Sequence, residues 1–487
     1  MSARRTLQAA SLALALASAG CTVGPDFKTP EPPAVDRYVP GAQPGAIGAI
    51  NLVSQRDIPA EWWSIFGSAA IDDLVRRALA ASPTLEQARA RLVQAQELRL
   101  ARSGATEYPK VDATASAVRQ RIDPATFGFP EAPNPGPFNV FTIGANVSYT
   151  FDLFGGTRRE LEALGAEVDY QAYELEAARL TLATNVVITA IRQAALDAQI
   201  ATTADILAAQ RSQLGIVEKR YDLGGVALLD VQNQRALVAQ TEASLAPLTA
   251  QFAQASHLLA VYVGEPPAAF ATPAIRLADL RLPPELPLTL PSELARQRPD
   301  IRANEALLHK ASANVGVATA DLYPKIVVSG ALSTSQLSVS DLFGNGFNVW
   351  NFGVNLLQPL FRGGELQARK RAAVAAFDQA AAAYRLSVLQ GLQNVADVLR
   401  ALEADEAALA ARSEQASRAS DAYRITVGRY HAGGVSQLAV LDAERVRLQA
   451  DTERLQAIAN RFADAAALFQ ALGGGWTRQD PTAALVR

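Results

Sequence analysis

Side chains that could carry catalysis or hold a metal are sparse in this sequence. His257, His309 and His431 are the only histidines, and none of them stands at metal-ligand spacing from another histidine or from the single cysteine. No glycine-rich phosphate loop follows a predicted strand. The many Asp and Glu residues recur at helical intervals beside Arg and Gln, a pattern typical of solvated helix faces. The sequence therefore predicts no catalytic site, no metal site and no bound cofactor, and we expect that the protein is not an enzyme.

Cys21 is the one residue for which covalent chemistry is predicted. Residues 1–20 have a charged start, an apolar middle and small residues before the cysteine, which is typical of a secretory signal peptide. A cysteine directly after such a leader resembles the processing site of a bacterial lipoprotein, in which the thiol is acylated, for example with palmitate, and becomes the mature N-terminus. The residue three places earlier, usually aliphatic, is Ser18 here. The alternative is an ordinary secreted protein with an incidental cysteine, although Cys21 has no possible disulfide partner within the chain.

Two short motifs combine charged, aromatic and glycine residues with the same spacing. The first is Arg220-Tyr221-Asp222-Leu223-Gly224-Gly225, and the second is Arg429-Tyr430-His431-Ala432-Gly433-Gly434. A double glycine after a long helical run is a helix stop. The two tyrosines lie 209 positions apart (430 − 221), so the motifs mark equivalent points of a duplicated chain.

Each motif ends a long run without proline that is rich in the strong helix formers Ala, Gln, Arg, Leu and Glu. The runs are Thr157 to Arg220 and Glu365 to Gly428, and as helices each would extend for roughly 96 Å. No single globular core has that width. Tyr108-Pro109-Lys110 is matched by Tyr323-Pro324-Lys325 further along, which also supports a duplication. We expect a first repeat over residues 71–263 and a second over residues 295–472.

Within each repeat the hydrophobic period changes from that of a helix to that of a strand. Apolar residues from Phe141 to Phe151 alternate with Thr, Gly, Asn and Ser, and Val111 to Ala117 alternates in the same way. The second repeat shows a similar, less regular pattern. We predict one β-hairpin at about 111–151 and another at about 326–357, each inserted between helices.

Two such hairpins would give four strands per chain, each of the length that crosses an outer membrane when tilted. Four strands cannot close a barrel, and unpaired strand edges cannot face hydrocarbon. Other copies of the chain must therefore complete the sheet, and three copies would supply twelve strands, an even number that suits such barrels. The alternative is a fragment of a soluble β-sandwich with one buried face. Both ends of each hairpin return to helices, so all the helices would lie on one side of the membrane. With a secretory signal, that side would be the periplasm.

The net charge of the chain is −3, which does not predict a basic surface that binds nucleic acid. The remaining segments are predicted to be connections. Residues 21–70 are rich in Pro, Gly and Ala, so we expect an extended N-terminal strap rather than a domain. Trp62 and Trp63 are expected to pack this strap onto the helices. Residues 264–294 hold too many prolines for a helix and form a connector, and residues 473–487 form a C-terminal tail.

Several of these segments together resemble the TolC-like outer membrane efflux proteins, and most of all their lipoprotein branch, often labelled NodT. The residues that carry the resemblance cover essentially the whole mature chain. They are Cys21-Thr22-Val23-Gly24-Pro25-Asp26-Phe27, the segment from Trp63 to Leu74, the two Arg-Tyr-x-x-Gly turns, Val440-Leu441-Asp442-Ala443-Glu444-Arg445, and the closing stretch from Ala471 to Trp476.

The resemblance implies a fold that is mainly α with a membrane β-barrel. Duplicated long-helix hairpins would form a trimeric helical tunnel beneath a twelve-stranded barrel. It also implies docking to a periplasmic adaptor and to an inner membrane pump of the resistance-nodulation-division type. In the family the hairpin tips close the tunnel and meet the adaptor, which places those roles on Arg220, Tyr221, Asp222, Gly224, Gly225, Arg429, Tyr430, Gly433 and Gly434. The alternative is that these glycines serve only as helix stops.

One departure from the family concerns carboxylates near the second tip. Some relatives carry two carboxylates three residues apart, on one helix face, and the matching positions here are Ala439 and Asp442. Asp230 lies after the first tip. Asp230 and Asp442 are therefore candidate gate carboxylates, and the alternative for each is a carboxylate favoured by the dipole at a helix start.

The function implied is a passive exit duct in the outer membrane, lipid-anchored and extending into the periplasm, for small molecules delivered by a pump. The first alternative is the outer membrane component of a type I protein secretion system. A second is a soluble periplasmic coiled-coil protein such as an adaptor, although known adaptors lack a strand pair in each of two repeats.

Overall fold

The computed structural model describes residues 22–40, 45–48, 50–54, 58–344 and 349–475. The chain forms two compact units, each assembled from separate segments. The first contains the N-terminal residues up to Thr29 together with Leu92–Tyr170 and Asn304–Tyr384, and the second contains Pro30–Arg91, Gln171–Ala303 and the residues from Arg385 on. The predicted signal peptide, Cys21 and the tail from residue 476 onward lie outside the described residues.

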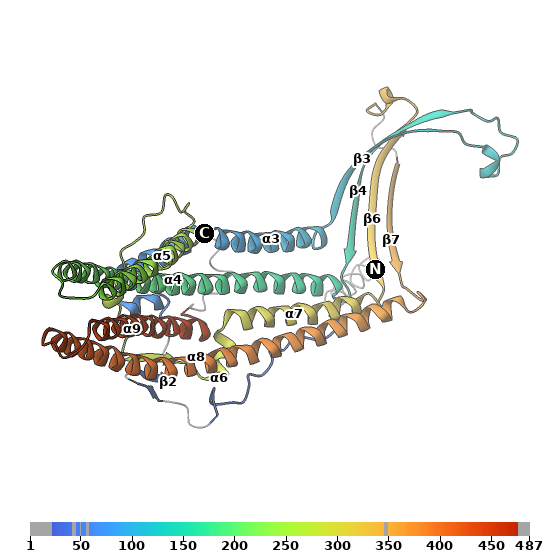
Figure 1. The fold of residues 1–487 in the computed structure, drawn as a ribbon. Coiled ribbons are helices and arrows are strands. Elements are labelled where there is room, and N and C mark those ends of the chain that lie inside the picture. Colours follow the sequence, from blue (N-terminus) through green and yellow to red (C-terminus); the bar gives the residue numbers. More distant parts are fainter. Residues whose placement is uncertain (1–21, 41–44, 49, 55–57, 345–348, 476–487) are drawn as a thin grey trace. The chain divides into compact units, whose positions relative to one another are not determined.

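The first unit holds an antiparallel sheet of four strands, which lie side by side in Figure 1. The strands are β3 (Lys110–Gln120), β4 (Phe138–Phe151), β6 (Lys325–Gln336) and β7 (Val349–Leu357), in the order β3-β4-β6-β7. Both predicted hairpins are confirmed. The two hairpins also pair with each other, through β4 and β6, so that β3 and β7 are left as edges.

The register of this sheet collects apolar residues from all four strands on one face. In one row across the sheet Val111 pairs with Val147, Val147 with Gly330, and Gly330 with Phe352. The neighbouring residues of each strand, such as Asn146 and Asn351, lie on the opposite, polar face. On β4 the apolar positions from Phe141 to Phe151 span about 34 Å along the strand, or about 24 Å at a tilt of 45°, which matches the apolar band of an outer membrane barrel.

Four helices contribute to the first unit and continue beyond the segments assigned to it. They are α3 (Pro83–Thr106), α4 (Gly156–Asp222), α7 (Pro299–Ala320) and α8 (Glu365–His431). The two long predicted helices are confirmed, each a few residues longer than the sequence pattern indicated. No helix among the described residues has the length and apolar content needed to cross a membrane.

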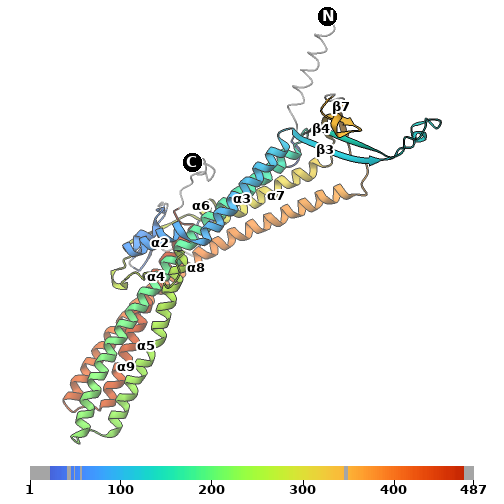
Figure 2. The same ribbon diagram turned by 90° about the horizontal axis from the view of Figure 1, so that it is seen from above.

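In the second unit, the parts of α4 and α8 that belong to it lie beside α5 (Leu228–Tyr262) and α9 (Gln437–Ala471), as Figure 2 shows. Helices α4 and α8 have 67 residues each, and α5 and α9 have 35 each. Shorter helices, α2 (Ala69–Ala81) and α6 (Pro291–Gln297), precede α3 and α7. The same succession of helices, hairpin and long helix pair thus occurs twice, as the duplicated motifs indicated.

The core of the second unit includes the tryptophans that precede the first repeat. The 3-10 helix η1 (Trp62–Phe66) buries Trp62, Trp63 and Phe66. The indole of Trp62 stacks on the ring of Phe469 of α9 with their centroids 5.2 Å apart, and Phe66 meets Phe462 edge to face. These rings serve packing, as expected.

The N-terminal strap contains regular structure that the sequence did not indicate. Strands β1 (Ala46–Ile47) and β2 (Ile50–Ser54) pair with each other, and β2 pairs in parallel with β5 (Glu285–Leu288) of the connector. The expected extended strap thus includes strand pairings that were not predicted. These strands are very short, and the prolines of the connector argue against a strand in the sequence. Pro287 nevertheless belongs to β5 and lies opposite Val53. A further short helix, η3 (Leu277–Asp279), lies in the connector.

Candidate functional site

The two helix-hairpin tips have the same backbone geometry. At the first tip, the Gly224 N–H donates to the carbonyl of Tyr221 (2.8 Å) and the Gly225 N–H to that of Arg220 (2.7 Å). At the second tip, the Gly433 N–H donates to Tyr430 (3.0 Å) and the Gly434 N–H to Arg429 (2.8 Å). Gly224 and Gly433 both have φ of +73°. This is the Schellman arrangement, in which a glycine in the left-handed region ends a helix and satisfies its last carbonyls.

A side-chain contact joins the two tips to each other. The Arg220 Nη1 donates a hydrogen bond to the Tyr430 hydroxyl at 3.0 Å, and its guanidinium carbon lies 5.8 Å from the centre of the Tyr430 ring. Arg220 comes from the end of α4 and Tyr430 from the end of α8. The contact therefore links the two repeats at their tips and is formed by two residues that the sequence analysis singled out.

The other tip residues face solvent. Tyr221, Asp222 and Arg429 are exposed, while His431 lies against the Tyr430 ring at 5.8 Å. The two turns differ in two side chains, since Asp222 and Leu223 of the first correspond to His431 and Ala432 of the second. Leu223 is 86% exposed, whereas the equivalent residue of the second turn is Ala432.

The two candidate gate carboxylates have different surroundings. Asp230 lies in the first turn of α5, where its Oδ2 accepts a hydrogen bond from the Ala227 N–H at 3.1 Å, as a carboxylate at a helix start does. Asp442 is exposed on α9 and forms an ion pair with Arg445 at 3.1 Å. By the spacing of the repeats, Asp230 corresponds to Ala439, so the two carboxylates do not stand at equivalent positions.

Four polar side chains are buried between the helices near the tips, among apolar neighbours such as Val231 and Val440. Gln210, Gln234, Gln437 and Glu444, from α4, α5 and α9, are all buried. The Gln437 Nε2 donates a hydrogen bond to Gln234 Oε1 (3.4 Å), and the Gln234 Nε2 donates one to the main-chain carbonyl of Gln210 (3.2 Å). Burial raises the pKa of the Glu444 carboxyl above its usual range, while Arg447 and a hydrogen bond from Gln210 oppose that rise. We name these four residues the polar layer. Buried polar groups specify one packing of helices more strictly than apolar groups do.

A second group of carboxylates lies further along α8 and α9. Asp405 faces Asp464, and Glu406 next to it forms an ion pair with Arg461. The Asp405 Oδ2 is buried and accepts no hydrogen bond from the described residues. Burial, followed by the charge of Asp464, raises the pKa of Asp405 to about 6, so Asp405 is mostly protonated below that pH.

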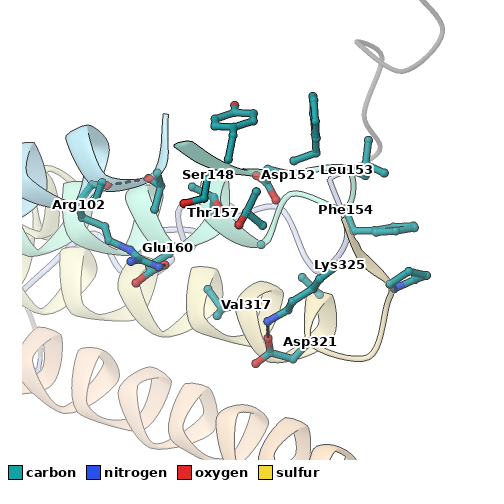
Figure 3. A pocket seen from close by; sticks show the side chains of 18 of the residues that line it. Arg102, Ser148, Asp152, Leu153, Phe154, Thr157, Glu160, Val317, Asp321 and Lys325 are labelled. Carbon is teal, nitrogen blue, oxygen red and sulfur yellow. Dashed lines mark hydrogen bonds and ion pairs between the residues drawn. The ribbon is translucent and has the colours of Figure 1, made fainter. Parts of the chain in front are cut away.

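A polar pocket of about 350 Å³ lies where the strands of the first unit meet its helices (Figure 3). Four of its charged side chains form two ion pairs within the pocket. Arg102 bonds Glu160 at 2.5 Å, and Lys325 bonds Asp321 at 2.8 Å. These pairs join α3 to α4 and the end of α7 to the start of β6. The pocket is thus a junction between secondary structures, and its lining residues include neither His nor Cys.

The described residues contain no group of three or more His, Cys, Asp or Glu side chains placed to hold a metal ion. The sequence analysis missed the polar layer and the Asp405–Asp464 pair. Gln210 and Gln234 lie in helical stretches rich in Gln, where nothing in the spacing distinguishes a buried amide from a solvated one.

The sequence matches the family described as "Outer membrane efflux protein" over residues 74–265 and 290–474. The chain belongs to this family. This outer membrane efflux protein is 31% identical over 418 residues to the pyoverdine export outer membrane protein OpmQ of Pseudomonas aeruginosa PAO1, covering 85% of this chain and 87% of OpmQ. It is 27% identical over 474 residues to nodulation protein T of Rhizobium leguminosarum bv. viciae, covering 96% of this chain and 93% of that protein.

Among solved structures, the outer-membrane channel OprN superposes with a TM-score of 0.82 at 28% identity, covering 94% of this chain and all of the OprN chain. The resemblance to the TolC-like family and its NodT-type branch is thereby confirmed, as is the predicted fold class. The efflux protein is an outer membrane protein whose family consists of channels and not of enzymes.

Proposed function

We propose that this efflux protein is the outer membrane channel of a tripartite efflux system, a passive exit duct for small molecules. An inner membrane pump of the resistance-nodulation-division type would deliver the cargo through a periplasmic adaptor. The observation that carries the proposal is the four-stranded sheet with one apolar face, whose edge strands β3 and β7 pair with no further strand of the described residues. Such a sheet is stable in lipid only when its edges are paired.

Three copies of the chain would satisfy those edges. Strand β7 of one copy would pair with β3 of the next, and three sheets of four strands would close a twelve-stranded barrel. The apolar face would then contact lipid, and the polar face with Asn146 and Asn351 would line the passage. The helices that follow the strands would continue the passage into the periplasm.

The hairpin tips at Gly224–Gly225 and Gly433–Gly434 would meet the adaptor and close the passage at rest. This role is supported by the exposure of Leu223, Tyr221 and Arg429 and by the contact between Arg220 and Tyr430. Opening would be a shift between two packings of the helices, favoured by adaptor binding. The bonds of the polar layer, which join different helices, would change in such a shift, whereas the ion pair of Asp442 with Arg445 and the helix-start bond of Asp230 lie within single helices.

Deletion of the gene tests the function directly. In cells that keep the matching pump and adaptor and have no second outer membrane channel, we expect export to fall to the background of a pump deletion. Export is followed as efflux of a fluorescent pump substrate, and a plasmid copy of the chain is the control that should restore it. The relative OpmQ is named for pyoverdine export, which makes pyoverdine a second substrate to assay. Unchanged efflux in the deletion strain would refute the proposal.

The substitution Tyr430→Phe tests the resting gate. It removes the hydroxyl that accepts the hydrogen bond from Arg220 and keeps the ring. An exposed hydrogen bond of about 1 kcal/mol corresponds to a change of about fivefold in the ratio of closed to open channels. We expect a similar increase in open time in planar bilayers. Tyr221→Phe, at the equivalent position of the first tip, is the matched control and should leave open time unchanged.

Acylation of Cys21 is tested by Cys21→Ala. We expect labelled palmitate to be incorporated into the wild-type chain and lost completely from the variant, because the thiol is the group that is acylated. Equal labelling of both proteins would show that the lipid, if any, is attached elsewhere. Cys21→Ser is a second variant that keeps the size of the side chain and should also lose the label.

A further inference from the structure

The residues that follow Cys21 lie against the end of a strand of the transmembrane sheet. The Val23 N–H donates a hydrogen bond to the carbonyl of Phe154 at 3.1 Å. Phe154 follows closely after Phe151, where β4 ends, and its ring stacks on Tyr323 at 4.6 Å. Figure 3 shows Phe154 and Leu153 in this turn between β4 and α4. The segment Thr22–Phe27, named here the N-terminal clasp, therefore starts at the level where the apolar face of the sheet ends.

Glycines from three segments allow the clasp to lie directly on the backbone beneath it. Gly24 has φ of +95°, and a Cβ there would lie 2.4 Å from the Gly316 Cα of α7. Gly155 has φ of +77°, and a Cβ there would lie 2.7 Å from the Thr22 Cγ2. Gly316 lies within a helix, where glycine is unfavourable, and a Cβ there would lie 2.7 Å from Arg159 Cγ. A side chain at Gly24 or Gly155 would therefore prevent the clasp from docking this closely, and one at Gly316 would collide with Arg159.

A buried arginine holds the clasp from the side of the helices. The Arg159 side chain is only 5% exposed and lies in the first turns of α4. It donates hydrogen bonds to three groups: from Nε to the Val23 carbonyl (3.3 Å), from Nη2 to Asp26 Oδ1 (2.6 Å) and from Nη1 to Glu162 Oε2 (2.7 Å). Two of these acceptors belong to the clasp. A guanidinium buried to this extent is costly unless its donors are satisfied, so its position in α4 depends on the clasp being docked.

The far end of the clasp is held by an aromatic contact. Phe27 stacks on the His309 ring with their centroids 4.4 Å apart and the planes 13° from parallel. The His309 Nε2 lies 2.9 Å from Glu162 Oε1, and Glu162 is also the partner of Arg159. The clasp thus contacts one connected set of side chains on α4 and α7, with Glu162 at its centre.

We propose that the N-terminal clasp is an intramolecular docking element that fixes the membrane anchor to the transmembrane sheet, with Arg159 as its positioning residue. The inference rests on the proposed lipid-anchored barrel. Because Thr22 lies against Gly155, an acyl chain on the preceding residue enters the membrane beside β4 rather than at the end of a free tether. Docking of the clasp then couples the anchor to the sheet, so that each stabilises the other.

The experiment compares Arg159→Gln with Arg158→Gln. The two arginines are neighbours in α4, but the Arg158 side chain is 48% exposed and donates hydrogen bonds to the carboxylate and the main-chain carbonyl of Asp152. Purified full-length proteins in detergent are treated briefly with trypsin, which can cut after the exposed Lys28, and mass spectrometry follows the appearance of chains that begin at Thr29. We expect cleavage at Lys28 to be at least tenfold faster in Arg159→Gln than in the wild type, with Arg158→Gln unchanged.

Asp26→Asn is a second variant for the case in which Arg159→Gln fails to fold. It leaves the buried Arg159–Glu162 pair in place and weakens only the half of the contact that belongs to the clasp. The same acceleration is expected, to a smaller extent. Equal cleavage rates in the wild type, Arg159→Gln and Asp26→Asn would overturn the proposal, as would an Arg158→Gln variant that is cleaved as fast as Arg159→Gln.

A double-mutant cycle tests the coupling itself. The midpoints of heat denaturation are measured for Cys21→Ala, Arg159→Gln and the double variant. If anchor and clasp act through one linkage, the double variant loses no more stability than the more damaged single variant. Additive losses would mean that Arg159 only supports the fold locally. None of these readouts depends on export, so a failure here is distinguishable from a failure of the proposed function.

Discussion

Phe352→Arg is expected to abolish assembly of the protein in the outer membrane. Phe352 of β7 is 70% exposed on the apolar face of the sheet and pairs with Gly330, near the middle of the apolar band. An arginine on the lipid face at the middle of the bilayer costs about 2–4 kcal/mol per chain, and the proposed barrel would contain three copies. Density-gradient fractionation of membranes should then show the variant depleted from the outer membrane fraction at least tenfold.

Asn351→Arg is the matched control, because it introduces the same side chain one residue earlier, on the polar face. There the arginine would line the water-filled passage, so we expect normal assembly and a change only in conductance. If both variants assemble normally, or if both fail equally, the two faces of the sheet do not have the environments proposed for them.

Asp405→Asn is expected to stabilise the protein at neutral pH and to reduce its pH dependence. The pKa of Asp405 in the folded protein is about 6, above its ordinary value of 3.8, so the folded state binds more protons between these values. The contribution of Asp405 to the free energy of unfolding is therefore most favourable below about pH 4, falls as pH rises to about 6 and stays at the lower level above it. Solvent screens this partly exposed pair, and we expect a gain of about 1–2 kcal/mol for the amide at pH 7.5.

The measurement is the difference between the denaturation midpoints of variant and wild type at several pH values. The difference should be close to zero at pH 4 and should grow to its full value by pH 7. Asp397→Asn serves as the control, because Asp397 is an exposed carboxylate of the same helix that bonds Gln393. A stabilisation by Asp405→Asn that is the same at pH 4 and pH 7.5 would rule out the raised pKa of Asp405 as its cause.

The long helices and the two hairpins could be predicted because each is a local pattern repeated over many residues. Helices α4 and α8 lack proline for their full length and end at glycines that the Schellman turns require. The strands β3 and β4 show the two-residue period of a sheet with unlike faces. Duplication strengthened both predictions, since each pattern had to occur twice at the same spacing.

The contacts that hold these elements together could not be predicted from local sequence patterns. Arg159 is one arginine among many on helices, and only the structure shows that the backbone of the strap folds back over it. The strand β2 pairs with β5, which is more than 200 positions away and contains a proline. Asp405 and Asp464 lie on different helices, so no spacing in the sequence brings them together. The site residues at the tips remain predictions for the same reason, because their partners would be other proteins.

The two tips share one backbone geometry but differ in side chains, with Leu223 and Asp230 at the first where the second has Ala432 and Ala439. In the proposed assembly of three chains, the six tips would form a ring with approximate sixfold symmetry. First and second tips, which present different side chains, would alternate around it. A partner built from six identical subunits would meet the same backbone geometry at all six tips. It would meet the same side chains only at every second tip. Such a partner would bind through two classes of contact of unequal strength, so titration of the channel with adaptor should show two successive steps of equal stoichiometry.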